Sequence, residues 1–344
     1  MARWRRSLLL WYGEHGRHLP WRATTDPYRI WLSEIILQQT RIVQGLPYYE
    51  RFMQSFPTIE ALAKADIDQV MNLWQGLGYY SRARNLHKAA QQIVARGAMP
   101  ATYEEWLQVS GVGPYTAAAV ASFALGERRA VVDGNVYRVL ARHYGIDTPI
   151  DTTEGKRLFS ELAQRLIDTE RPGDYNQAIM DFGALQCLPQ GPLCESCPMT
   201  EQCVACRMES AEEWPVRSRT TRVQTLFLVM LYVRMPAGIW LHKRTDADIW
   251  QGLYEPLTLR FDHQPAMAEV VAAARLPKDA VFRPVMAQQK HLLSHRQLWV
   301  DGYEVRLSEN RSRKGFVCVP ETSRGDYAVS TLVARFYEKL DRTE

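Results

Sequence analysis

Five of the six cysteines lie within one short segment of the chain, which makes them the first candidates for chemistry. Cys187, Cys194, Cys197 and Cys203 have the spacing C-x6-C-x2-C-x5-C. Four thiolates this close together can hold an iron–sulfur cluster. The alternative is a structural zinc ion held by two CxxC pairs, Cys194/Cys197 and Cys203/Cys206. Only five residues separate these pairs, whereas zinc ribbons usually leave about 15–20. The spacing therefore favours the cluster, with Cys206 as a spare thiol.

Two acidic residues could form a catalytic pair. Glu34, in WLSEIILQQT, shares a helical face with apolar neighbours such as Leu37. If that face is packed, desolvation favours the protonated form of Glu34. Asp133, in AVVDGNVYRVLARHY, precedes a predicted helix whose N-terminus would keep it ionised. Two carboxyls in opposed environments can serve as acid and anion, although Asp133 or Asn135 alone is more often a simple helix cap.

A glycine-containing turn is the third motif, in VSGVGPYTAAAVASFAL. Gly111 and Gly113 fall between two predicted helices, and Pro114 suits the first turn of the second helix. Glycines at such a turn let backbone N–H groups approach a phosphate at a helix N-terminus. Because helical hairpins with glycine turns are common, the motif alone indicates plain structure as readily as phosphate binding.

Helices must position these residues, since residues 1 to about 205 show no alternating strand pattern of any length. Asp26-Pro27 predicts the start of the helix that carries Glu34, as an N-cap followed by a first-turn proline. Thr58 can cap the next apolar stretch. SRARNLHKAAQQIVARG has helical spacing and is predicted to end at Gly97.

The composition changes after residue 206. RMESAEEWPVRSRTTR is polar, without clear period, and is typical of a linker. QTLFLVMLYVRM and GIWLHKRT flank MPAG and predict a β-hairpin, and QLWVDGYEVRL predicts another with Asp301-Gly302 at its turn. With helices near 265–275 and 328–340, these elements make a small α+β domain. The predicted organisation is a helical domain at 1–206, a linker at 207–222 and a second domain at 223–344.

The composition allows real cores, because 46% of the residues are hydrophobic, and no apolar run approaches the roughly 20 residues of a membrane span. The short N-terminal apolar stretch is followed at once by Glu14 and His15, unlike a secretory signal. We expect a soluble, intracellular protein. Residues 1–100 carry 13 Lys or Arg and 7 Asp or Glu, whereas residues 101–210 carry 9 and 15. A basic first part permits a polyanionic partner without proving one.

Together, the hairpin with GVG, the later aspartate and the four cysteines resemble the endonuclease III superfamily of DNA glycosylases. Within it, LPWR (19–22), WLSEIILQQT, GLGYYSRARNLHKAA (76–90) and VDGN resemble the A/G-specific adenine DNA glycosylases, the MutY type. The resemblance implies an all-α helix-hairpin-helix glycosylase domain with a 4Fe–4S cluster on the four cysteines. A small α+β nudix-like domain that recognises the lesion opposite adenine would follow. It also implies a monovalent cation at the hairpin turn.

The resemblance implies a mechanism as well. Glu34 matches the general acid that protonates adenine at N7, and Asp133 matches the carboxylate that stabilises an oxocarbenium-like sugar. Tyr115 and Asn135 match the supporting polar residues. In bifunctional relatives a lysine occupies the position of Tyr115, and a phenol cannot form a Schiff base. The implied enzyme is a monofunctional glycosylase with water as the final acceptor.

Further site residues come from the same matching. The adenine pocket would be lined by Trp21, Arg22, Leu37 and Asp181. DNA contacts or wedges would come from Gln39, Thr40, Leu77, Gly78 and Tyr79, with Gly111 and Gly113 at the hairpin. A family Phe-Ser-His loop reads the lesion, and here it is Leu293-Ser294-His295. Ser294 and His295 can still hydrogen-bond a base edge, although an ordinary polar turn is the alternative. No REXXEE-like cluster accompanies Glu255 or Glu269, so nucleotide hydrolysis is not expected.

The implied partner is double-stranded DNA containing A:8-oxoguanine or A:G mispairs, with the protein acting as a monomer and without a membrane. For a bacterial source, the expected location is the cytoplasm, associated with the nucleoid. Two alternatives stay open. One is a relative that excises thymine from mismatches or an oxidised pyrimidine, and the other is a catalytically silent iron–sulfur protein that only binds DNA.

Overall fold

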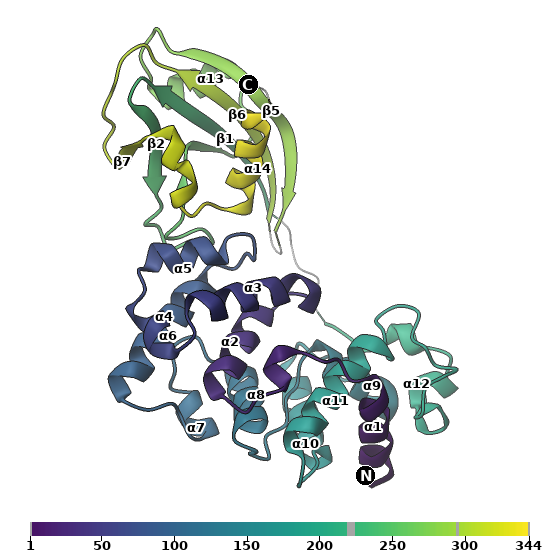
Figure 1. The fold of residues 1–344 in the computed structure, drawn as a ribbon. Helices are drawn as coiled ribbons and strands as arrows, with labels where there is room; N and C mark the ends of the chain where they lie inside the picture. Colours follow the sequence, from purple (N-terminus) through teal and green to yellow (C-terminus); the bar gives the residue numbers. More distant parts are fainter. Residues whose placement is uncertain (1, 219–223, 294–295, 343–344) are drawn as a thin grey trace. The chain divides into compact units, whose positions relative to one another are not determined.

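The computed structural model describes residues 2–218, 224–293 and 296–342. The chain divides into two compact units (Figure 1). The first comprises Met1–Lys64 and Lys88–Thr220, and the second comprises Ala65–His87 and Thr221–Glu344. The second unit thus takes in a short helical segment from the first part of the sequence. The domain boundaries predicted near 206 and 222 stay a prediction.

The first unit is helical, and the structure has no strand between residues 2 and 218. Its elements in chain order are α1 (Ala2–His15), η1 (Pro20–Arg22), α2 (Pro27–Leu37), α3 (Ile42–Ser55), α4 (Ile59–Lys64), α6 (Ser81–Arg96, shared with the second unit), α7 (Tyr103–Trp106), α8 (Pro114–Ala124), α9 (Gly134–Tyr144), α10 (Thr153–Leu166), α11 (Pro172–Leu185), η2 (Thr200–Gln202), α12 (Val204–Arg207) and η3 (Ala211–Glu213). Among the described residues, no helix is long and apolar enough to cross a membrane.

Three predicted helix ends are confirmed. The Asp26 side chain accepts a hydrogen bond from the backbone N–H of Tyr28 at 2.9 Å and so caps α2. The Thr58 hydroxyl accepts one from Ala61 at 3.3 Å, at the start of α4. Helix α6 ends before Gly97, whose φ of 83° lies in the left-handed region that favours glycine.

Helix α8 occupies the centre of the first unit. Its Thr116–Ser122 segment is buried throughout, and α2, α7 and α11 pack against it. The run of alanines in this segment allows these close approaches because the side chains are small. Helix α9 in turn packs on α11. This arrangement explains how Glu34 on α2, Tyr115 on α8 and Asp133 at the start of α9 come together although they are far apart in sequence.

The second unit contains a sheet with helices on its faces (Figure 1). Its strands are β1 (Gln224–Met235), β2 (Gly238–Lys243), β3 (Tyr254–Glu255), β4 (Leu257–Phe261), β5 (Val281–Leu292), β6 (Arg296–Arg306) and β7 (Phe316–Val319), and its other elements are α5 (Ile67–Trp74), α13 (Met267–Ala274), η4 (Glu321–Asp326) and α14 (Thr331–Asp341). The strand order is β3-β2-β1-β6-β5, with β4 paired to β1 and β7 to β2. Strands β1 and β6 are parallel, and the other pairs are antiparallel.

Strand β1 is apolar on both sides because both faces of the sheet are covered. One core contains Leu228 and Met230 together with Phe336 of α14. The other contains Val229 together with Val270 of α13. The predicted hairpin between β1 and β2 is confirmed, as are the two predicted helices. Burial on both faces explains why the sequence of β1 is a continuous apolar run rather than an alternating one.

The second predicted hairpin is wrong. Asp301 and Gly302 lie in the middle of the continuous strand β6 and not at a turn. A Cβ atom on Gly302 would lie 2.5 Å from Cε2 of Phe336, so glycine is needed here for the close approach of an aromatic ring. The Asp301 carboxylate accepts hydrogen bonds from the backbone N–H of Gln288 at 2.6 Å and the side chain of Gln264 at 2.7 Å. Gly302 thus makes room for an aromatic ring, and Asp301 holds the backbone at Gln288 and the side chain of Gln264.

Candidate active site

Glu34 lies on the buried face of α2, where only 6% of the residue is exposed. Burial raises the pKa of its carboxyl from 4.5 to about 7. A hydrogen bond from the Tyr115 hydroxyl and the charge of Arg22 act in the opposite direction, while Asp133 adds to the increase. The direction agrees with the prediction from sequence. A carboxyl with this pKa can hold a proton at neutral pH and release it.

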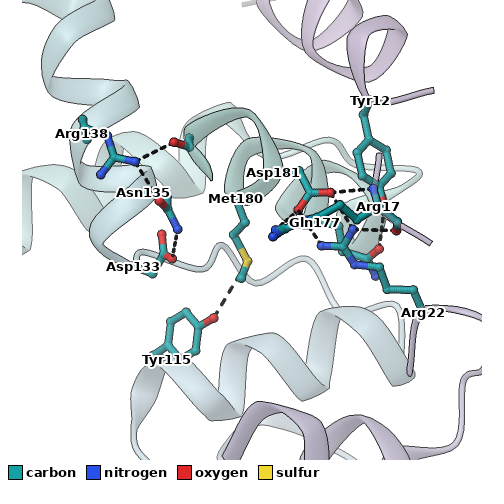
Figure 2. A network of polar contacts seen from close by, with 11 residues as sticks. Tyr12, Arg17, Arg22, Tyr115, Asp133, Asn135, Arg138, Gln177, Met180 and Asp181 are labelled. Carbon is teal, nitrogen blue, oxygen red and sulfur yellow. Dashed lines mark hydrogen bonds and ion pairs between the residues drawn. The ribbon is translucent and has the colours of Figure 1, made fainter. Parts of the chain in front are cut away.

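Tyr115 is the second residue of α8, directly after Pro114. Its hydroxyl is hydrogen-bonded to the Glu34 carboxyl. The same hydroxyl lies 3.9 Å from the sulfur of Met180 (Figure 2). Burial, followed by the charges of Glu34 and Asp133, raises the pKa of this phenol well above its ordinary value. Tyr115 is therefore a neutral hydrogen-bond donor and not a nucleophile at physiological pH.

Asp133 is the N-cap of α9. One carboxylate oxygen accepts from the backbone N–H of Val136 at 2.8 Å, and the other accepts from the Asn135 side chain at 2.8 Å. Burial raises the pKa of Asp133, and it outweighs these hydrogen bonds and the charge of Arg138, which lower it. The sequence predicted a raised pKa for Glu34 and an ionised Asp133. Burial raises the pKa of both carboxyls, so their environments differ less than predicted.

The Asn135 side chain is itself held in place, by a residue that the sequence analysis missed. Arg138 donates to the Asn135 side-chain oxygen at 2.8 Å, to the carbonyl of Gly183 at 2.6 Å and to the carbonyl of Cys187 at 2.8 Å (Figure 2). A Cβ on Gly183 would lie 2.6 Å from the Cβ of Asn135, so this glycine permits the contact between α11 and α9. Arg138 shares its helix face with Asn135 and Arg142, which lie three and four residues away, so no isolated polar position marked it in the sequence.

Asp181 on α11 forms a second polar centre, on the other side of Met180 in Figure 2. Its fully buried carboxylate accepts from Arg22 at 2.7 and 2.9 Å and from both the backbone and side chain of Arg17. Burial alone would raise the pKa of Asp181, but the hydrogen bonds from Arg22 and Arg17 outweigh it and hold the pKa below its usual value. Asp181 is thus an ionised acceptor. Arg17 was missed because it lies four residues before Trp21, outside the LPWR motif.

Four more predicted site residues lie just before α2 or around its C-terminal end: Trp21 and Leu37 of the predicted pocket, and Gln39 and Thr40 of the predicted DNA contacts. Trp21 is buried in η1, with its ring edge-on to Tyr49 at 4.9 Å between centroids. Leu37 is the last residue of α2 and is partly buried. Gln39 is exposed and has a left-handed φ of 55°, which turns the chain sharply after α2. Next to it, the Thr40 hydroxyl donates to the Gln38 carbonyl at 3.3 Å.

Predicted DNA contacts in the second unit differ in accessibility. Leu77 is buried, whereas Tyr79 is 46% exposed and has a left-handed φ of 46°. Gly78 between them has a φ of 73°, and Arg82 donates to the carbonyls of Leu77 and Gly78 at 3.3 and 3.2 Å. The Tyr79 ring is thus accessible, while Leu77 packs internally. Ser294 and His295 lie outside the described residues.

The hairpin turn has the expected glycine geometry. Gly111 has a φ of 74°, and the turn closes with a hydrogen bond from Val112 N–H to the Val109 carbonyl at 3.1 Å. Gly113 is extended and precedes α8, with open space where a Cβ would be. Both glycines are exposed, so backbone groups of the turn can approach a ligand. The predicted cation at this turn stays a prediction.

The two glutamates considered for a nudix-type magnesium site have other partners. Glu255 is buried and forms a salt bridge with Arg244 at 2.8 Å. Glu269 is exposed on α13, where it accepts from the backbone N–H of Ala266 at 2.7 Å. The expectation that the chain does not hydrolyse nucleotides stays a prediction.

Cysteine side chains line one cavity of the first unit. They come from Cys187, Cys194, Cys197, Cys203 and Cys206. Arg142, which also lines it, donates to the Cys187 sulfur at 3.3 Å and to the carbonyls of Leu188 and Pro189 at 2.6 and 2.9 Å. Burial raises the pKa of the Cys194, Cys197 and Cys203 thiols, and a bound metal cofactor would require their thiolate form.

The lining of this cavity is chemically suited to a thiolate-bound cofactor. Its five cysteine side chains surround one space, and thiolates are the donors that hold iron–sulfur clusters. Within residues 2–218, 224–293 and 296–342, no group of three or more His, Cys, Asp or Glu side chains is already arranged to hold a metal ion. The donor chemistry therefore fits an iron–sulfur cluster, with Cys187, Cys194, Cys197 and Cys203 as the residues that would hold it.

Family comparison defines the class. Residues 32–165 match the HhH-GPD superfamily of base excision DNA repair proteins, and residues 229–339 match the NUDIX domain. A solved thermostable thymine-DNA glycosylase is 30% identical, with a TM-score of 0.56, and the alignment covers 60% of this chain and 95% of that one. A trapped endonuclease III–DNA covalent intermediate has a TM-score of 0.52 at 20% identity, covering 60% and 94%, and supports the fold alone. The predicted helical repair domain followed by a nudix-like domain is confirmed.

Relatives identify the family within this class. The adenine DNA glycosylase of Buchnera aphidicola (subsp. Acyrthosiphon pisum) is 33% identical over 250 residues, which cover 72% of this chain and 71% of that protein. The human adenine DNA glycosylase is 46% identical over 213 residues, covering 58% of this chain and 39% of the human protein. The chain belongs to the adenine DNA glycosylase family. Its alignments span about two-fifths of the human and rat relatives.

Proposed function

We propose that the chain is a monofunctional DNA glycosylase of base excision repair. It would hydrolyse the N-glycosidic bond of adenine mispaired with 8-oxoguanine or guanine in duplex DNA. The observation that carries this proposal is the Glu34 carboxyl, whose pKa of about 7 suits a general acid, next to neutral Tyr115 and the carboxyl of Asp133. A protein that only binds DNA has no need of two desolvated acids in one pocket, since each is costly to bury.

The proposed reaction begins with extrusion of the adenine from the helix into the pocket. Glu34 donates its proton to N7. The bond between N9 and C1′ then breaks, and its electron pair passes to the protonated base, which leaves as neutral adenine. Asp133 stabilises the positive charge that develops on the sugar, as paired carboxyls do in glycosidases. Water then adds hydroxide to C1′ and returns a proton to Glu34. Tyr115 and Asn135 keep the two carboxyls in position.

Recognition of the base is assigned to the pocket residues Trp21, Arg22, Leu37 and Asp181. The Asp181 carboxylate is fully buried and already accepts hydrogen bonds from Arg22 and Arg17, so its proposed part is to hold Arg22 in position beside the base. An aromatic and an aliphatic side chain would contact the flat faces of the base.

Contacts with the duplex are assigned to two segments of the chain. In the first unit they come from Gln39, Thr40 and the glycine turn, whose backbone could approach a phosphate. In the second unit the exposed ring of Tyr79 is the candidate wedge between bases, with Gly78 supplying the turn before it. Ser294 and His295 are the candidates for reading 8-oxoguanine. The partner is thus double-stranded DNA with the mispair, bound by a monomer.

A 4Fe–4S cluster is the proposed resident cofactor, held by Cys187, Cys194, Cys197 and Cys203. It would supply structural support by fixing the loop that follows α11. Arg138 and Arg142 would transmit this support, because each donates to the carbonyl or sulfur of Cys187 from the helix that Asp133 caps. Iron and acid-labile sulfide analysis of the purified chain tests this, with about four irons expected and one zinc contradicting it.

Single-turnover assays test the proposed activity most directly. Duplexes with A opposite 8-oxoguanine, G, C or T are incubated with the protein, and alkali then reveals abasic sites. Excision from the A:8-oxoguanine and A:G duplexes is expected, and intact strands in both would refute the proposal. Release of T from a G:T duplex would instead favour the thymine-specific alternative, to which the 30% identical thymine-DNA glycosylase points. A borohydride-trapped adduct would contradict the role of Tyr115.

A variant pair separates the enzyme from a silent DNA-binding protein. Glu34→Gln removes the proton donor, whereas Glu50→Gln changes an exposed glutamate on α3 and serves as the control. We expect the parent and Glu50→Gln to release adenine, and Glu34→Gln to bind the duplex without releasing it. Binding by all three proteins with no release by any would support the silent binder.

A further inference from the structure

Cys206 lines the same cavity as the four proposed cluster ligands, although the C-x6-C-x2-C-x5-C pattern does not include it. It belongs to the short helix α12, which begins directly after Cys203. The backbone N–H of Cys206 donates to the sulfur of Cys203, and its thiol is hydrogen-bonded to that of Cys194. The Cys206 thiol therefore touches one of the four expected ligands, and its backbone touches a second.

The backbone around α12 fixes this position. Gly145, just after α9, has a φ of 66°, and a Cβ there would lie 2.6 Å from Cγ1 of Val204, so α12 packs directly on the end of α9. Hydrogen bonds from Met208 to Val204 and from Ser210 to Ala205 complete the turn after it, at 3.0 and 3.1 Å. Cys206 thus points into the cavity because its helix is held there.

We propose that Cys206 is a reserve ligand, able to bind the cluster in place of Cys194. This inference rests on the cluster proposed above. The step is a ligand exchange without electron transfer: the Cys206 thiol loses its proton and forms an iron–sulfur bond, and the bond to Cys194 breaks as that sulfur takes up a proton. A fifth thiol would retain the cluster when one bond opens.

The position of Cys206 makes the exchange selective. The Cys206 thiol is hydrogen-bonded to that of Cys194, and its backbone N–H donates to the Cys203 sulfur, whereas Cys197 is hydrogen-bonded by Met199 N–H and Thr200. Cys206 should therefore compensate for loss of Cys194 but not for loss of Cys197. Cys318 is exposed in the second unit and provides a control for general effects of removing a thiol.

The test measures iron and acid-labile sulfide in the full chain, purified without oxygen. The parent, Cys206→Ala and Cys318→Ala should each hold about four irons. Cys194→Ala should keep most of its iron, and the double variant Cys194→Ala/Cys206→Ala should hold at least about fivefold less, as should Cys197→Ala. Equal iron in the single and double Cys194 variants would overturn the proposal.

A second measurement covers variants that fail to fold. Iron release from the parent and from Cys206→Ala to a chelator is followed by absorbance. Release should be several-fold faster from Cys206→Ala, because an iron that has lost its bond to Cys194 can no longer bind Cys206. Equal rates would overturn the proposal. A parent that contains no iron refutes the cluster itself, whereas an iron-loaded parent with equal release rates refutes only the role of Cys206.

Discussion

Replacing Glu34 with glutamine should abolish base release while making the protein more stable at alkaline pH. Glutamine has nearly the same shape as glutamate but has no proton to donate to the base. General acid catalysis of this kind contributes about 10²–10⁴-fold to a rate, so we expect at least about a 10²-fold loss. The stability gain follows from burial, since glutamine removes the cost of ionising a carboxyl in this pocket.

The size and sign of the gain follow from the two pKa values. The unfolded chain loses the proton of Glu34 near pH 4.5, and the folded chain keeps it until about pH 7. In that window the folded state binds more protons, so the free energy of unfolding falls as the pH rises. A change in pKa from 4.5 to about 7 corresponds to about 3 kcal/mol. The Glu34→Gln variant lacks this loss, so its advantage over the parent should grow by about 2–3 kcal/mol between pH 5 and pH 8.

Urea unfolding of both proteins at pH 5 and pH 8 measures this difference, alongside single-turnover excision and duplex binding. Glu50→Gln is the control, because it makes the same replacement at an exposed position. Two results would refute the reasoning. One is a variant that retains base release, and the other is an advantage that stays constant or shrinks as the pH rises, since Glu34 would then not carry a raised pKa.

Three further substitutions have distinct expected outcomes. Tyr115→Phe removes a hydrogen bond that lowers the pKa of the catalytic acid, so the alkaline limb of the pH–rate profile should move to higher pH; an unmoved or lower limb contradicts this. Asp181→Asn leaves two partly buried arginines without their carboxylate and should cost about 3–5 kcal/mol in urea unfolding. Gly302→Ala places a methyl group 2.5 Å from the Phe336 ring and should cost about 1–3 kcal/mol, whereas an unchanged unfolding midpoint would show that the ring can shift.

Local chemistry allowed much of the fold to be predicted from the sequence. Asp26 and Thr58 could be recognised as helix caps because each side chain accepts a hydrogen bond from a backbone N–H only two or three residues later. The same holds for the cysteine spacing and the glycine turn. The Asp301-Gly302 pair was misread because an identical dipeptide serves a tight turn or a close ring contact, and only the position of Phe336 on α14 decides between them.

Long-range contacts account for what the sequence did not reveal. Arg138 lies within the helix that Asp133 caps, yet two of its partners, Gly183 and Cys187, are 45 and 49 residues away. No periodicity indicates which carbonyls a buried arginine will reach. The burial of Asp133 also depends on distant residues. The sequence indicated that Asp133 begins a helix, but not which elements exclude water from it.

A long-range contact also bears on the acid–base character of Glu34. Arg22 lowers the pKa of Glu34, and its guanidinium is hydrogen-bonded to Asp181, 159 residues away. We expect the Asp181 carboxylate to offset part of this lowering, because it balances the charge of the guanidinium. In Asp181→Asn the charge of Arg22 is no longer balanced, so the pKa of Glu34 should fall and the alkaline limb of the pH–rate profile should move to lower pH. An unmoved limb would mean that burial of Glu34 acts independently of this ion pair.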